Sequence, residues 1–388
     1  MAHDCQVREL DYFEKRYCKL NRICLSLIGL WPYSAPKKRF FRKLVVNGTF
    51  LVILIVQITS IITVDDFQLL MEVISNFVLY LTCVLMYYNS LFNMPKISQL
   101  LELIKQDWLE KENMKEFEIM KKYAKDGRMY SLMIIMLTYG LIFLVMSVSA
   151  IPYILDIYFP LNQTRFHTLP FSVELFIDTE KYYCLAFFII FFTSSLSCIV
   201  VVGNYTLFAV LVYHICGMFC VVRNMLDDVV DVTKEYVYDR NTEDIAYAKI
   251  IRSIKYHKKT LEFDSIFNSS FEQGLSILLL KNSAFEYENI RETISSILNI
   301  IVNCGILYMK CHLGQKIIDH SVLIFDKTFD MPWYMLSKKS QMLLCFMMMR
   351  SLKPCYFVLA NFFILSIKFS ISVIQTTLSY AMVMYSLQ

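Results

Sequence analysis

The sequence predicts an all-α membrane protein that crosses the bilayer seven times, with a cytoplasmic amino terminus and an extracellular carboxyl terminus. Three observations lead to this prediction: the chain is 56% hydrophobic, its apolar residues gather in long stretches, and its positive charge falls on alternate connections. An apolar run of about 18 residues or more can cross a hydrocarbon core of about 30 Å. The predicted spans are residues 44–64, 73–94, 131–151, 182–213, 266–280, 294–311 and 354–387.

The distribution of Lys and Arg sets the predicted orientation. Of the 38 Lys and Arg residues, 32 lie in the amino-terminal tail and in the second, fourth and sixth connections. Lys and Arg beside a span stay on the cytoplasmic side of the membrane. The amino terminus is therefore expected inside and, with an odd number of spans, the carboxyl terminus outside. A G-protein-coupled receptor has the opposite orientation.

The segments between the spans are assigned from their patterns, and the whole chain, 1–388, is expected to form one membrane domain. The cytoplasmic tail, residues 1–43, has apolar residues at helical spacing, and Trp31-Pro32 is expected to end that helix as an aromatic anchor at the interface. The cytoplasmic connections are predicted to be helical extensions of the spans, in residues 95–130, 214–264 and 312–353.

Two further segments carry specific expectations. The outer connection 152–181 holds Asn162-Gln163-Thr164, a glycosylation sequon on the side that the charge distribution places outside. The fifth span, 266–280, is short and is followed by a charged segment, so it is either a truncated helix or a defect of the gene sequence. The sequence alone leaves both explanations open.

Composition argues against several classes of protein. No nucleophile–base pairing, metal cluster or Gly-rich phosphate loop is recognisable, so no enzyme, cofactor or metal is expected. Cys311-His312 with His320 has spacing too loose to predict a metal site. The net charge of +4 is explained by its segregation to one side of the membrane, and nucleic acid is not expected as a partner. Basic runs such as Lys37-Lys38-Arg39 are expected to anchor the topology on a solvated face, with contact to anionic lipid headgroups as the alternative.

The carboxyl-terminal part of the chain contains short motifs in a fixed order. They are His214-Ile215-Cys216-Gly217-Met218-Phe219, Gly314-Gln315 with Asp319-His320-Ser321, Trp333-Tyr334, and the closing segment Ser379-Tyr380-Ala381-Met382-Val383-Met384-Tyr385-Ser386-Leu387. In this order they resemble the insect odorant receptors over about residues 214–388. The amino-terminal half is similar to that family mainly in topology and length.

The resemblance implies an odorant-gated, non-selective cation channel in the plasma membrane of the olfactory neuron dendrite. In that family four subunits surround a pore lined by the last helix, here 354–387, and a tuning subunit pairs with a shared coreceptor in a heterotetramer. Aligned on the Ser-Tyr segment, Val383 and Leu387 match the hydrophobic constriction of the pore, and Ser386 would lie beside them.

A pocket for a small volatile molecule needs apolar and aromatic walls with few polar groups. The outer halves of the second, third, fourth and sixth predicted spans offer such residues, and Ser147 and Ser149 could each supply a hydrogen bond. The candidate pocket residues are Phe77, Tyr80, Met146, Ser147, Tyr153, Phe187, Phe191 and Ile297.

Three alternatives remain at this stage. Gustatory receptors share the topology, although their usual closing motif is replaced here by Ser379-Tyr380 and Ser386-Leu387. The coreceptor carries a much longer second cytoplasmic connection than 214–264, which favours a tuning subunit. A G-protein-coupled receptor would require an inverted topology, and its Asp-Arg-Tyr and Asn-Pro-x-x-Tyr motifs are not found.

Overall fold

The computed structural model describes residues 19–109, 114–159, 169, 182–235, 240–271, 290–359 and 362–386. Within these ranges the chain is helical apart from one hairpin of two short antiparallel strands. The helices are α2 (Lys19–Leu27), α3 (Pro36–Thr63), α4 (Phe67–Phe92), α5 (Met94–Leu109), α6 (Met114–Tyr158), α7 (Tyr183–Glu235), α8 (Arg240–Phe271), α9 (Ile290–Phe329), the 3-10 helix η1 (Trp333–Met335), α10 (Lys338–Ser351) and α11 (Ile367–Ser386). The strands are β1 (Val358–Leu359) and β2 (Phe363–Ile364).

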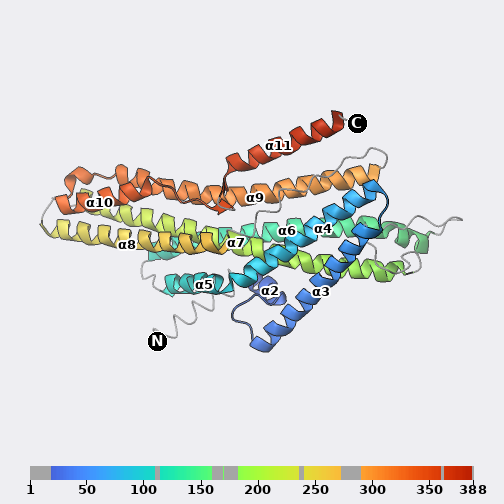
Figure 1. Ribbon diagram of the computed structural model, residues 1–388. Helices are drawn as coiled ribbons and strands as arrows, with labels where there is room; N and C mark the ends of the chain where they lie inside the picture. The colour runs from blue at the N-terminus through green and yellow to red at the C-terminus, as the bar shows by residue number, and fades with distance from the viewer. Residues whose placement is uncertain are drawn as a thin grey trace.

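Helix α7 is the central element of the fold. It has 53 residues, which at 1.5 Å per residue gives a length of about 80 Å. It packs against α2, α4, α6, α8 and α9, and the long helices α6, α8 and α9 run beside it (Figure 1). Its stretch from Leu211 to Phe219 is buried throughout, because helices cover it on every side. Since α7 is far longer than a bilayer is thick, it joins an apolar part of the molecule to a polar part.

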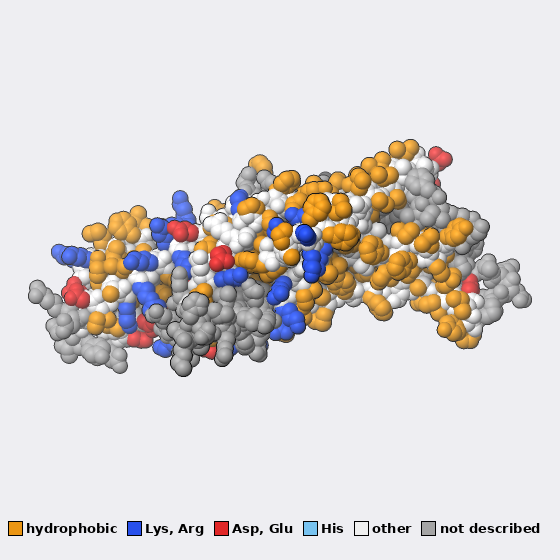
Figure 2. Space-filling model, turned by 90° about the horizontal axis from the view of Figure 1, so that it is seen from below, with side chains coloured by type: hydrophobic (Ala, Val, Ile, Leu, Met, Phe, Trp, Pro, Cys, Tyr) orange, Lys and Arg blue, Asp and Glu red, His pale blue; other side chains and the backbone are white. Residues whose placement is uncertain are grey.

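The surface divides into these two parts. Hydrophobic side chains cover the end formed by α3, α4 and the neighbouring parts of α6 and α7, whereas Lys, Arg, Asp and Glu gather towards the end with α8 and α10 (Figure 2). Four described helices are long and apolar enough to cross a membrane, within Pro36–Thr63, Val73–Phe92, Lys115–Tyr158 and Tyr183–Thr233. These helices match the first four predicted spans and mark the chain as a membrane protein.

The remaining predicted spans differ in outcome. The sixth span lies within α9, while most of the fifth span, 266–280, lies outside the described residues. The last span was expected to begin at residue 354, but α11 begins at Ile367. Pro354 cannot continue the preceding helix, and the residues after it form the β1–β2 hairpin, with Leu365 N donating to Phe357 O at 3.0 Å.

The turn after α2 corrects the expectation for Trp31. Gly29 has a φ of +73°, and the backbone N–H groups of Leu30 and Trp31 both donate to Leu25 O, at 2.8 and 3.1 Å. This glycine turn closes the helix end and directs the chain back towards the bundle. Trp31 is consequently 5% exposed and packs inside the protein. The prediction that it anchors the chain at the membrane interface was therefore wrong.

A buried polar cluster connects α5, α7 and α8 in the polar half. Asp107 is 1% exposed and accepts hydrogen bonds from the Tyr256 hydroxyl at 2.8 and 3.0 Å. Lys259 Nζ lies 3.3 Å from Asp107 Oδ1, and His214 Nε2 lies 3.7 Å from Oδ2. A buried carboxylate is tolerated only when it is paired and hydrogen-bonded. The cluster therefore specifies how the three helices pack in the predicted cytoplasmic extensions.

Candidate functional site

Two polar contacts define an aromatic cluster in the apolar half of the bundle. Tyr80 on α4 is 6% exposed, and its hydroxyl lies 3.3 Å from Ser194 Oγ on α7. Tyr183, near the start of α7, donates to Ser149 O on α6 at 2.8 Å. These two bonds tie α7 to α4 and to α6 and satisfy hydroxyl groups that are costly to bury alone.

The ring of Tyr183 connects further aromatic residues to this cluster. It stacks on Tyr153 with ring centroids 5.3 Å apart, and the Phe187 centroid lies 6.1 Å away on the next turn of α7. Ring pairs at these separations add stabilisation beyond their buried area. We call Tyr80, Tyr153, Tyr183, Phe187 and Ser194 the outer aromatic cluster, after the side of the membrane that the sequence predicts for this half of the chain. Its members form two groups along α7, because Ser194 lies about three turns beyond Tyr183.

The predicted pocket residues differ in how deeply they are buried in the structure. Tyr80 and Met146 are buried, Phe77, Ser147, Tyr153 and Phe187 are half-buried, and Phe191 is 43% exposed. The side chain of Ile297 lies outside the described part of the chain, as does Asn162. Tyr153 and Phe187 are brought together through Tyr183. Phe191 is not buried within this chain.

Sequence reasoning missed Tyr183 and Ser194. Tyr183 continues the four-residue spacing of Phe187 and Phe191 along α7, so helical periodicity could have placed it on the same face. Ser194 carries no comparable signal, because a lone Ser in an apolar helix is most often bonded to its own backbone. Only the packing of α4 against α7 brings it to Tyr80.

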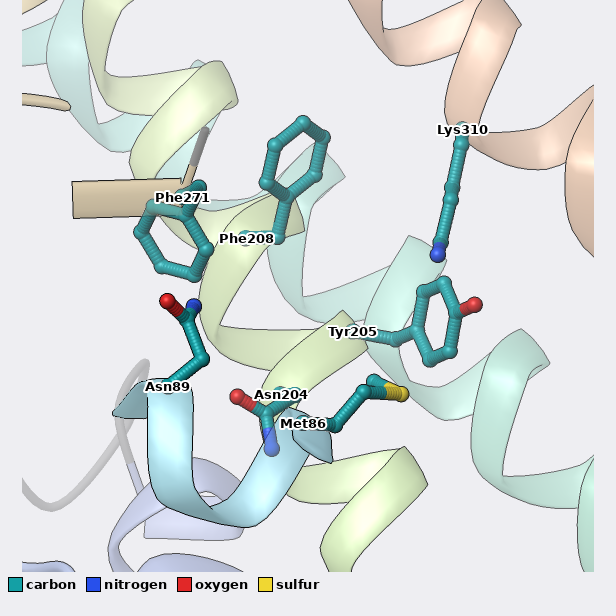
Figure 3. A pocket seen from close by; sticks show the side chains of 7 residues that line it. All are labelled: Met86, Asn89, Asn204, Tyr205, Phe208, Phe271 and Lys310. Carbon is teal, nitrogen blue, oxygen red and sulfur yellow. The ribbon is translucent and has the colours of Figure 1, made fainter. Parts of the chain in front are cut away.

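A second group of residues lines a small cavity deeper in the bundle, between α4, α7, α8 and α9 (Figure 3). We call it the inner cavity. Its volume is about 20 Å³, which is room for about one water-sized molecule. Its lining residues are Met86, Asn89, Asn204, Tyr205, Phe208, Phe271 and Lys310. None of them was predicted as a site residue.

Helix α9 holds the segment that leads into α11. Gly314 lies so close to this segment that an added Cβ would be 2.3 Å from Leu365 O. Gln315 Oε1 accepts from the backbone N–H of Ile367, the first residue of α11, at 3.4 Å. Ser321 Oγ accepts from Cys355 N at 3.0 Å. We call these contacts the α9–α11 junction. They fix where the last helix begins.

Asp264 on α8 packs beside this junction and gives a test of pH dependence. Burial raises the pKa of its carboxyl from 3.8 to about 7, against the smaller effects of Cys355, Arg350 and Asn268. Between about pH 4 and pH 7 the folded chain holds a proton that the unfolded chain releases, so this group makes stability fall as pH rises. The unfolding temperature of the wild-type protein should therefore decrease between pH 5 and pH 7.5. In the Asp264→Asn variant, this contribution to the decrease is expected to be absent.

Comparing the two proteins isolates the effect of Asp264. Burial lowers the pKa of His257 to about 4, so that residue destabilises the fold as pH falls below about 6.5, in the opposite direction. His257 is present in both proteins and cancels in the difference between them. Identical pH profiles of the unfolding temperature would contradict the burial effect at Asp264.

Comparison with known proteins decides the family. The family model described as 7tm Odorant receptor matches residues 66–378, which is most of the chain. The chain belongs to this odorant receptor family. No curated protein sequence gives a significant match.

Solved structures agree in fold with this odorant receptor. The insect olfactory receptor OR5 from Machilis hrabei, in complex with eugenol, is 13% identical, with a TM-score of 0.73 over 98% of this chain and 100% of that one. Another structure of the insect olfactory receptor OR5 from Machilis hrabei gives a TM-score of 0.72 at 12% identity, with the same coverage. The predicted resemblance is therefore confirmed, and the protein is a receptor of the membrane and not an enzyme.

Proposed function

We propose that this odorant receptor is the tuning subunit of an odorant-gated cation channel in the plasma membrane of olfactory neuron dendrites. The observation that carries this proposal is the outer aromatic cluster, an aromatic face in the apolar half of a receptor of this family, with the Tyr80 and Tyr183 hydroxyl groups bonded across helices. The short interval between α7 and α8, from Glu235 to Arg240, supports a tuning subunit because it has no room for a coreceptor's long insert.

The proposed ligand is a small volatile molecule that is mostly apolar. Burying apolar surface yields about 25 cal/mol per Å², which is sufficient for micromolar binding without a charged partner. The Machilis receptor of the same fold was solved with eugenol, which supports a volatile ligand in this fold. The pocket residues proposed here are Phe77, Tyr80, Met146, Ser147, Tyr153, Phe187, Phe191 and Ile297, together with Tyr183 and Ser194.

The Tyr80 hydroxyl is proposed to hydrogen-bond odorants that carry an oxygen atom. Tyr80→Phe is expected to raise the half-maximal concentration for such odorants by about 2- to 10-fold, which corresponds to one neutral hydrogen bond. Responses to a hydrocarbon of the same shape should be unchanged. The matched control is Phe188→Leu on α7, because Phe188 is 65% exposed. An equal loss for both odorants would assign Tyr80 a packing role instead.

The pore is proposed to be lined by α11, with Val383, Ser386 and Leu387 at its constriction. The side chains of Val383 and Ser386 and the whole of Leu387 lie outside the part of the chain that the structure describes. Helix α11 extends away from the bundle after the α9–α11 junction and ends towards the end of the molecule where α3 ends and α4 begins (Figure 1). Ile371, Leu378 and Met382 are between 49% and 65% exposed. Such an uncovered apolar helix is expected to be covered by neighbouring subunits around a common axis.

A second apolar surface supports assembly of four subunits through the cytoplasmic layer. Met342, Phe346, Met349 and Leu352 follow one another at helical spacing along α10 and its end, and each is at least 60% exposed. Exposed apolar residues gathered in this way usually mark a protein interface. We assign this surface to contact with the coreceptor in a heterotetramer.

The test is whole-cell current in cells that express this chain with or without an insect coreceptor, during exposure to an odorant panel. Odorant-evoked cation current only when both are expressed is the expected result. Current from this chain alone would exclude the tuning-subunit assignment. Labelling an epitope at the amino terminus in intact cells tests the orientation, and labelling without permeabilisation would favour a G-protein-coupled receptor topology.

A further inference from the structure

Lys310 places an amine inside the bundle with no acidic partner. Its side chain is 4% exposed, and it extends from α9 to the face of the Tyr205 ring, with Nζ 3.9 Å from the ring centroid (Figure 3). No Asp or Glu lines the inner cavity, and among the described residues Lys310 takes part in no ion pair. The aromatic ring attracts the ammonium, but this attraction is smaller than the cost of removing the charge from water.

The polar groups around Lys310 are mainly hydrogen-bond donors. The Asn204 side chain is already satisfied, because its oxygen accepts from Ser90 Oγ and its nitrogen donates to Val200 O at 2.9 Å. Asn89 Oδ1 accepts from Asn93 at 3.0 Å, and the Asn89 side chain lies on the opposite side of the cavity from Lys310 (Figure 3).

The hydroxyl of Tyr205 adds a further donor to this set. It is buried and has no hydrogen-bond partner among the described residues. A site rich in donors selects a guest that accepts hydrogen bonds. A site that also contains an ammonium group selects an acceptor with negative charge.

The volume of the inner cavity limits the size of such a guest. At about 20 Å³ it has room for a single water-sized particle, so a small monatomic anion fits it better than a carboxylate or a phosphate. We propose that the inner cavity binds one small monovalent anion of the size of chloride or bromide, beside Lys310. The anion neutralises the buried ammonium and connects α9 to α7. This site is separate from the outer aromatic cluster and does not depend on the proposed function.

The proposal is tested with the purified full-length receptor in detergent, in sodium chloride or sodium gluconate at equal ionic strength. An anion that binds only the folded state raises the unfolding temperature as its concentration rises. A shift of about 3 °C in favour of chloride is expected. Bromide should act as chloride does, and sulfate should act as gluconate does, because the larger anions do not fit the cavity.

Variants assign the effect to the inner cavity. Lys310→Met is expected to abolish the difference between chloride and gluconate. The matched control is Lys316→Met on the same helix, where Nζ lies 5.2 Å from the Tyr213 ring centroid and the side chain is only half-buried. This control should retain the full chloride effect. A chloride effect that survives Lys310→Met would overturn the proposal.

A second variant keeps the test decisive if Lys310→Met does not fold. Tyr205→Phe preserves the ring beneath the ammonium and removes only the unpartnered hydroxyl. It is expected to weaken halide affinity several-fold, as measured by titration of the unfolding temperature and by chloride-35 NMR line broadening. Equal unfolding temperatures of the wild-type protein in chloride and gluconate would show that the cavity holds water beside a neutral amine.

Discussion

Gly314→Ala is expected to abolish odorant-evoked current while the protein still reaches the membrane. The added Cβ would lie 2.3 Å from Leu365 O and 2.8 Å from Leu365 Cβ. The closest atom belongs to the backbone, so no side-chain rotation relieves the contact and α9 must separate from the segment that leads into α11. Overpacking of this kind costs about 1–3 kcal/mol, which is about 5- to 150-fold in a conformational equilibrium.

Gly305→Ala is the matched control for this prediction. Gly305 lies in the same helix, and an added Cβ there would meet nothing within 4 Å. Alanine at that position should leave the current unchanged and stabilise the helix by up to about 1 kcal/mol. Whole-cell current normalised to surface-labelled receptor measures both variants. Normal current from Gly314→Ala would show that α11 does not depend on this close approach.

Asp107→Ala is expected to destabilise the receptor by about 3–5 kcal/mol, the range for removing one partner of a buried ionic pair. The change deprives Lys259 of a carboxylate at 3.3 Å and the Tyr256 hydroxyl of its acceptor. The Lys259 ammonium and the Tyr256 hydroxyl would then remain in or near the core without the carboxylate that offsets the cost of removing them from water. The expected results are a much lower unfolding temperature in detergent and little receptor at the cell surface.

An exposed ion pair in the same half of the molecule supplies the control. Glu118 and Lys121 lie 3.0 Å apart with largely accessible side chains. Glu118→Gln should cost at most about 1 kcal/mol, because exposed pairs contribute little. Adding Lys259→Met to Asp107→Ala should recover part of the lost stability if the coupling is electrostatic. Additive losses in the double variant would contradict that origin.

Local composition was sufficient to predict the class of the protein and the positions of its first four spans. Hydropathy depends on local composition, and the cost of placing polar groups in hydrocarbon makes a long apolar run a reliable signal. The ordered motifs from His214 to Ser386 also predicted the odorant receptor family, which the match over residues 66–378 confirms. Orientation, pocket and pore stay predictions, since they concern sides and neighbours that local composition does not specify.

Tertiary structure alone decided which residues meet across helices. Tyr80 forms a hydrogen bond with Ser194, and Asp107 accepts one from Tyr256. The sequence separations of these pairs are too long for any periodic pattern to predict. Trp31 was predicted at the interface but is buried, because the turn at Gly29 directs the chain back into the bundle. Lys310 resembles any lysine near the end of a span, and only the packing of α9 against α7 places its amine over Tyr205 in a cavity. Such contacts depend on helix rotation and close packing, which a linear pattern constrains only weakly.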